Sequence, residues 1–155
     1  MEVEERRDTT ERHSAATLLK WAYLILEEGR FEEALQACDQ AAAVATEEQE
    51  QLLARALGGA IYSAQGRPQE ALRVLMGLHR RHQRSAPVAL YLAEACFLAG
   101  RHRRGWKVLE SIEEQLEPAG PWASLAAQLR ETWQLLEQSQ GSPSPNEDGA
   151  QQEGG

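Results

Sequence analysis

The stretch Gly66-Arg67-Pro68-Gln69-Glu70-Ala71 organises the chain, because it occurs twice more in altered form. The earlier copy is Gly29-Arg30-Phe31-Glu32-Glu33-Ala34, and the later one is Gly100-Arg101-His102-Arg103-Arg104-Gly105. Successive glycines are 37 and 34 residues apart. A period of about 34 residues, with an apolar helical stretch on each side of the turn, is typical of a helical solenoid. The sequence therefore predicts an all-α fold built from repeated helix pairs.

The residue types in this stretch suit a tight connection between two helices. A glycine readily adopts the left-handed conformation that ends a helix, so each of the three glycines is predicted to close the first helix of its pair. A very small residue stands five positions after each glycine, namely Ala34, Ala71 and Gly105. We expect these three residues where the second helix crosses closest to the first.

The three units resemble the tetratricopeptide repeat family over roughly residues 15–138. The positions that carry the resemblance in the first unit are Trp21, Ala22, Ile25, Gly29, Phe31, Ala34 and Ala41. Those in the second and third units are Gly59, Tyr62, Gly66, Ala71, Ala93, Gly100 and Leu109. The chain departs from the family pattern at Gly105, which replaces an Ala, and in a three-residue insertion near Thr46–Gln51. It also lacks the helix-ending Pro after the first two units.

This resemblance implies a right-handed α-α superhelix of three helix pairs whose first helices line a concave face. It also implies a non-catalytic module, since the family usually holds peptide segments of partner proteins. A last helix, predicted from Trp122 to about Glu137, is expected to cap the solenoid, because an end repeat would otherwise expose its core. Its apolar residues fall on one helical face, and they are Trp122, Leu125, Ala126, Leu129, Trp133 and Leu136.

Residues 14–138 are predicted to form one helical repeat domain between two polar ends. Residues 1–13 are charged and lack helical apolar spacing, so they are expected to be frayed or disordered before Ser14, a candidate N-cap. Residues 139–155 contain almost nothing to bury and are expected to be disordered. The helices predicted before the last one span about 15–28, 31–45, 47–64 (with Gly58 and Gly59 inside), 68–84, 87–99 and 102–116.

The predicted helices at 15–28 and 87–99 each carry two apolar stripes, which indicates two packed neighbours, or one neighbour and a ligand. By the resemblance, the positions that face the concave side are Leu19, Tyr23, Leu26, Ala56, Ala60, Ser63, Leu90, Glu94 and Phe97. Family members that grip a C-terminal carboxylate use Lys, Arg and Asn there, and this set has none. We therefore expect the groove to hold an apolar segment, helical or extended, of another protein. The alternative is that some of these residues pack between adjacent repeats.

One basic concentration occurs in a chain whose net charge is −8. Its candidate residues are Arg80, Arg81, Arg84, Arg101, Arg103 and Arg104. One interpretation is that cations suit the C-terminal end of a helix, and the other is a surface for an acidic partner. The negative net charge, and the lack of aromatic residues among the arginines, argue against binding of nucleic acid.

The sequence contains no Gly-x-Ser-x-Gly, His-Glu-x-x-His or Walker motif, so we expect no enzyme and no cofactor. Cys38 and Cys96 lack metal-ligand spacing and fall on apolar faces, which predicts buried, reduced thiols and no metal site. The charged start lacks the pattern of a signal peptide, and no apolar run approaches the ~20 residues that span a bilayer. A cytoplasmic protein without membrane insertion is therefore expected.

Within the family, the layout is similar to that of the translocator chaperones of bacterial type III secretion, which have three repeats, a terminal helix and an acidic total charge. The segment Ala93-Glu94-Ala95-Cys96 is similar to one in their third unit. This resemblance implies a cytosolic chaperone for an apolar client, and a homodimer is compatible with it. The rival hypothesis is a scaffold or adaptor subunit of a multiprotein complex that docks through its outer face and the basic residues at 79–84 and 101–104.

Overall fold

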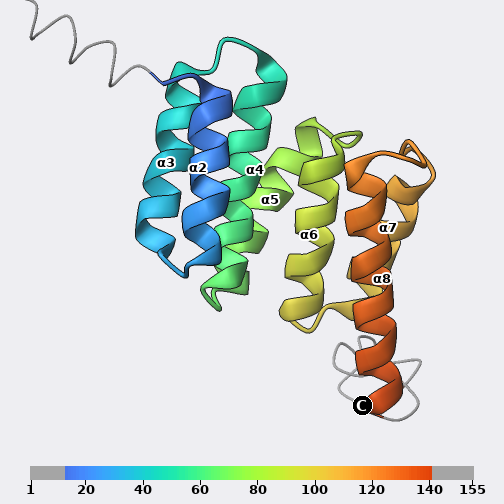
Figure 1. Ribbon diagram of the computed structural model, residues 1–155. Coiled ribbons are helices and arrows are strands. Elements are labelled where there is room, and N and C mark those ends of the chain that lie inside the picture. Colours follow the sequence, from blue (N-terminus) through green and yellow to red (C-terminus); the bar gives the residue numbers. More distant parts are fainter. Residues whose placement is uncertain (1–12, 141–155) are drawn as a thin grey trace, which may run out of the picture.

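The computed structural model describes residues 13–140, and within this range all regular secondary structure is α-helical. The described part of the chain contains seven helices (Figure 1). They are α2 (Ala15–Glu27), α3 (Phe31–Val44), α4 (Glu48–Ala64), α5 (Pro68–Arg81), α6 (Ala86–Leu98), α7 (His102–Glu113) and α8 (Pro121–Ser139). The all-α prediction is confirmed. The disorder predicted for 1–13 and 139–155 concerns residues that lie almost entirely outside the described range.

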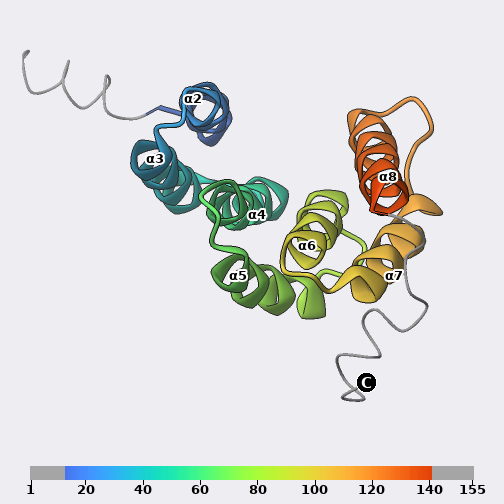
Figure 2. The ribbon, with the colours of Figure 1, turned by 90° about the horizontal axis from the view of Figure 1, so that it is seen from below.

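Each helix packs against its neighbours in sequence, and the pairs are arranged along an arc (Figure 2). Helices α2, α4, α6 and α8 lie on the inner side of the arc, while α3, α5 and α7 lie on the outer side. Contacts between α2 and α4, between α4 and α6, and between α6 and α8 agree with this arrangement. The inner side is therefore built from the first helix of each pair together with α8.

The three turn glycines adopt the conformation that the sequence predicts. Gly29, Gly66 and Gly100 have φ values of 79°, 78° and 82°. At the first turn, the backbone N–H of Arg30 donates to the carbonyl of Ile25 at 3.1 Å, which satisfies a carbonyl at the helix end. Any residue with a Cβ would be strained at these positions.

The small residues that follow the turns lie at buried helix crossings, as expected. Ala34 and Ala71 are fully buried, and Gly105 is buried against Phe97. A Cβ added to Gly105 would lie 2.7 Å from Cε1 of the Phe97 ring. The departure from Ala at this position therefore has a physical cause, because the aromatic ring occupies the space that a methyl group would need.

The two glycines inside α4 have different surroundings. A Cβ on Gly59 would lie 2.6 Å from Cγ of Leu75 in α5, whereas a Cβ on Gly58 would meet nothing within 4 Å. Of the two glycines, only Gly59 is therefore closely approached by another helix, through the side chain of Leu75.

Helix α8 closes the end of the arc by packing against α6 and α7. It buries Ala126 and Leu129, but Leu136, the last member of the predicted stripe, is 40% exposed. The ring of Trp133 stacks on Phe97 with centroids 4.9 Å apart, and Arg130 donates to Glu113 in α7 at 2.6 Å. The predicted one-sided stripe therefore packs over its first three turns only.

None of the described helices combines the length and the apolar character needed to cross a membrane.

Candidate binding groove

A groove of about 470 Å³ lies on the inner side of the arc, between α2, α4, α6 and the start of α8. Mostly apolar side chains line it, and they come from four helices. The lining residues are Tyr23, Leu26, Leu57, Ala60, Ser63, Ala64, Tyr91, Glu94, Leu98, Pro121, Trp122 and Leu125. The groove can therefore offer an apolar surface with few polar groups to a ligand.

A chain of aromatic side chains crosses this groove from α2 to α8. The hydroxyl oxygens of Tyr23 and Tyr91 lie 2.9 Å apart and share a hydrogen bond. The Tyr91 ring packs edge-on against Trp122, with centroids 6.1 Å apart. Burial is the main cause that raises the pKa of both tyrosines, so both hydroxyls stay neutral and can donate or accept.

Glu94 brings a carboxyl group to the apolar groove. Its side chain is partly buried, and burial raises its pKa above the ordinary value of a glutamate. Within residues 13–140, none of the hydrogen bonds and ion pairs satisfies this carboxylate. Its charge helps to raise the pKa of Tyr91, which lines the same groove.

Ser63 in α4 adds a second polar group that lacks a partner. Its residue is only 6% exposed, and its Oγ makes no hydrogen bond in the described structure. A buried hydroxyl without a partner costs roughly 1–3 kcal/mol, because it has lost its hydrogen bonds to water. The groove thus contains two polar groups whose hydrogen-bonding capacity is unused.

The structure divides the nine sequence-predicted positions between the groove and the core. Five of them line the groove, and these are Tyr23, Leu26, Ala60, Ser63 and Glu94. Four are buried in the core instead, and these are Leu19, Ala56, Leu90 and Phe97. The burial of Leu90 and Phe97 follows from α8, since both belong to one apolar cluster with Ala126 and Leu129. These four core residues are not part of the site described below.

The groove also contains residues that the sequence reasoning did not place there. On α6 these residues are Tyr91 and Leu98, which precede and follow the predicted Glu94 at a helical spacing of three and four. The second apolar stripe of this helix already contained Tyr91 and Leu98, so the signal was present. Trp122 and Leu125 were assigned to the packing face of α8, and both also reach the rim of the groove.

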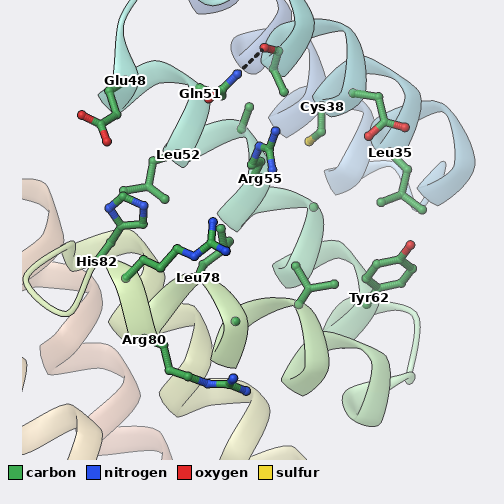
Figure 3. Close-up of a pocket in the computed structure, with 17 residues that line it drawn as sticks. Leu35, Cys38, Glu48, Gln51, Leu52, Arg55, Tyr62, Leu78, Arg80 and His82 are labelled. Atoms are coloured by element: carbon green, nitrogen blue, oxygen red, sulfur yellow. Dashed lines mark hydrogen bonds between the residues drawn. The ribbon is translucent and has the colours of Figure 1, made fainter.

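The opposite, outer side of the arc has a second pocket of about 720 Å³ between α3, α4 and α5 (Figure 3). Arg55, Arg80, Arg81 and His82 line it, together with apolar residues such as Leu52 and Leu78. Figure 3 shows Arg55 in the middle of the pocket and Arg80 at its edge. Arg55 was not among the predicted basic residues.

The predicted basic patch is divided between several surfaces. Arg80 and Arg81 line the outer pocket, whereas Arg84 lies in a separate hollow with Glu47, Glu48 and Glu50. Arg103 and Arg104 stand in the first turn of α7, and burial and then the charge of Arg104 lower the pKa of His79. Arg80 and Arg81 therefore share one pocket, which Arg84 does not line.

Metal binding and thiol reactivity each require a particular arrangement or environment of side chains. Between residues 13 and 140, no group of three or more His, Cys, Asp or Glu side chains is arranged to hold a metal ion. Cys38 and Cys96 are both buried, and burial raises the pKa of Cys38 to about 12, which keeps it as an unreactive thiol at neutral pH.

Comparison of this chain with protein-family models, with curated proteins and with solved structures yields no match.

Proposed function

We propose that this chain is a non-catalytic protein-binding module of the tetratricopeptide repeat type. In this proposal α2–α7 form the three helix pairs of a right-handed superhelix, α8 caps it, and the inner groove holds an apolar segment of a partner protein. The supporting features are the repeated Gly-Arg turns with positive φ, the buried small residues after them, and the arc of paired helices.

The observation that carries the binding function is the apolar surface left uncovered on the inner side of the arc. Leu98 is 46% exposed and Tyr23 is 36% exposed, and both line the groove. A groove of about 470 Å³ lined by apolar and aromatic residues falls within the size and character of ligand sites. An apolar segment, extended or helical, would bury this surface and gain free energy from it.

We propose as a narrower function that the chain is a cytosolic chaperone of the type III secretion translocator kind. Such a chaperone would keep an apolar client segment covered in the groove until the client is released. The support is the resemblance in layout and the apolar character of the groove. A second copy of the chain is the other occupant to be tested, and sedimentation of the purified protein with and without client distinguishes the two.

The experiment begins with capture of partners by the full chain, followed by titration of each purified partner. The groove variant combines Tyr23→Ala with Leu98→Ala, and the matched control combines Arg80→Glu with Arg81→Glu on the outer side. If the two groove residues are hot spots, each truncation should weaken binding by ~2 kcal/mol or more. The outer-side control should bind nearly as well as the unmodified chain. Binding that survives the groove variant would contradict the proposal.

The alternative function is a scaffold that docks through its outer face. The observation that favours it is the outer pocket with Arg55, Arg80 and Arg81, none of which makes an ion pair within the described residues. In addition, Arg103 and Arg104 stand at the positive end of the α7 dipole, where helix electrostatics do not favour them. The same titration separates the two functions. A scaffold should lose its partner on charge reversal at Arg80 and Arg81, and should tolerate the groove variant.

A further inference from the structure

Two of the polar side chains of the inner groove come from α4 and α6, which contact each other. Among the described residues that line the groove, Glu94 is the only Asp, Glu, Lys, Arg or His. Ser63, on the adjacent helix, is the buried residue whose hydroxyl has no partner. The function proposed above requires a ligand in this groove. The two polar groups therefore indicate which chemical groups that ligand must contain. The inference below rests on that proposed function.

A carboxylate in such a place is costly unless a cation pairs with it. Burial removes water from Glu94 and disfavours its charged form. The chain itself does not supply the missing cation within residues 13–140, because no Lys or Arg lines the groove. The presence of Glu94 in the groove, despite the free-energy cost of burying its carboxylate, is explained if a partner provides the cation.

The hydroxyl of Ser63 gives a second, independent indication that the ligand contains hydrogen-bond donors. The residue is more than nine-tenths buried and lines the groove, and its hydroxyl has unused capacity to accept a hydrogen bond within residues 13–140. The hydroxyls of Tyr23 and Tyr91 bond to each other, and each retains capacity to accept a further donor. The hydroxyl groups that line the groove with Glu94 can thus act as acceptors for a group with several N–H donors.

We propose that the segment bound in this groove carries a lysine or arginine between apolar side chains, and that this cation pairs with Glu94 while the Ser63 hydroxyl accepts one of its N–H groups. The aliphatic stem of such a residue would pack against Leu98, which is 46% exposed and lines the same groove. Low local polarity strengthens the ion pair, and the net charge of −8 favours a basic partner. Residues 141–155 contain neither Lys nor Arg, so this part of the chain cannot supply the cation.

The test uses the full chain and a phage-displayed library of random 12-residue peptides as the probe. Selection on the unmodified chain should enrich peptides that combine apolar residues with Lys or Arg. Parallel selection on Glu94→Gln should enrich apolar peptides without the basic residue. The control is Glu131→Gln, which removes the same charge from an exposed position on α8 outside the groove lining and should leave the enrichment unchanged.

The strongest enriched peptide is then synthesised and titrated against purified variants. Glu94→Gln should weaken its binding by roughly ten-fold or more, the range expected for loss of a desolvated ion pair. Ser63→Ala should weaken it by a smaller factor. A second peptide carries Glu in place of the basic residue. The Glu94→Lys variant should bind this second peptide better than it binds the original one, and the four combinations of protein and peptide form a double-mutant cycle.

The outcomes separate failure of this inference from failure of the proposed function. Enriched peptides that are apolar but not basic, and that depend on Tyr23 and Leu98, would overturn the inference and leave the binding function standing. Peptides that bind equally well to the Tyr23→Ala, Leu98→Ala variant would overturn the binding function itself. A selection that enriches nothing would overturn both. If deletion of residues 1–12 exposes a stronger binder, the chain's own Arg6, Arg7 or Arg12 is the occupant, and the external partner is refuted.

Discussion

The second and third helix pairs place very different side chains at the same repeat position, three residues before the turn glycine. In α4 this residue is Ser63, a small side chain whose hydroxyl has no hydrogen-bond partner among residues 13–140. In α6 it is Phe97, which is 2% exposed and packs between Trp106 and Trp133 with centroids 5.0 and 4.9 Å away. The same backbone plan thus leaves a groove at one pair and a filled core at the next. Phe97 is covered by α7 and α8, which pack over it, whereas Ser63 lines the inner groove.

The largest expected effect comes from emptying the filled position. Phe97→Ala should destabilise the domain by about 3–5 kcal/mol, because it leaves a cavity between α6, α7 and α8. The matched change Ser63→Ala should leave the stability of the unbound chain unchanged or raise it, because it removes a buried hydroxyl without a partner. Urea unfolding of both variants measures the difference. A similar loss for the two would mean that the second pair is packed as a core rather than as a groove.

A smaller effect is expected at the helix crossings. Gly105→Ala places a methyl group against the Phe97 ring and should cost about 1–3 kcal/mol through overpacking. Combining it with Phe97→Leu should recover part of this loss, because the smaller side chain makes room. In contrast, Gly58→Ala in α4 meets open space and should stabilise the helix by about 1 kcal/mol. Thermal melts of the three variants measure these differences in stability. If Gly105→Ala were as harmless as Gly58→Ala, the Phe97 ring would not fill the space next to Gly105 as described.

The smallest expected effect concerns the pH dependence of stability. The folded-state pKa of Glu94 is raised by burial, so the folded chain binds its proton more tightly than the unfolded chain does. This group therefore reduces stability as the pH rises through the ordinary pKa of a glutamate towards the raised value. Tyr91 and Tyr23, the titratable groups that line the groove with it, stay neutral over this range.

Glu94→Gln should accordingly match the unmodified chain in stability at acidic pH and exceed it near neutral pH. Denaturant midpoints measured from pH 4 to pH 8 provide the test, and Glu131→Gln, an exposed position, should run parallel to the unmodified chain. A gap that widened towards acidic pH would mean that Glu94 is stabilised as a carboxylate in the folded chain.

Much of the fold was predictable because each helix pair depends on local chemistry. The positive φ of Gly66, the N-terminal position of Pro68 and the N-cap Ser14, whose side chain accepts from the N–H of Thr17 at 3.1 Å, are all determined by residues adjacent in sequence. Helix boundaries predicted from these signals agree with the observed ones to within a few residues.

The candidate groove was predicted less completely, because its lining depends on which helix packs against α6. The sequence reasoning placed Phe97 on the groove and Trp122 in the cap. Packing of α8 against α6 buries Phe97 and brings Trp122 against Tyr91 at the groove rim. A rotation of one residue along a helix moves a side chain by about 100°, so a small difference in packing decides whether a residue lines the groove or joins the core.

The sequence by itself determined the all-α class, the positions of the turns and the small residues at the crossings, since glycine conformation and side-chain volume act locally. Only the tertiary structure decided that Tyr23 bonds to Tyr91 across the arc and that Phe97 is covered by Trp133. It also decided that Glu94 lines an apolar groove to which residues 13–140 contribute no Lys or Arg. These features join residues tens of positions apart in the chain. They arise from the relative placement of packed helices, which no local pattern encodes.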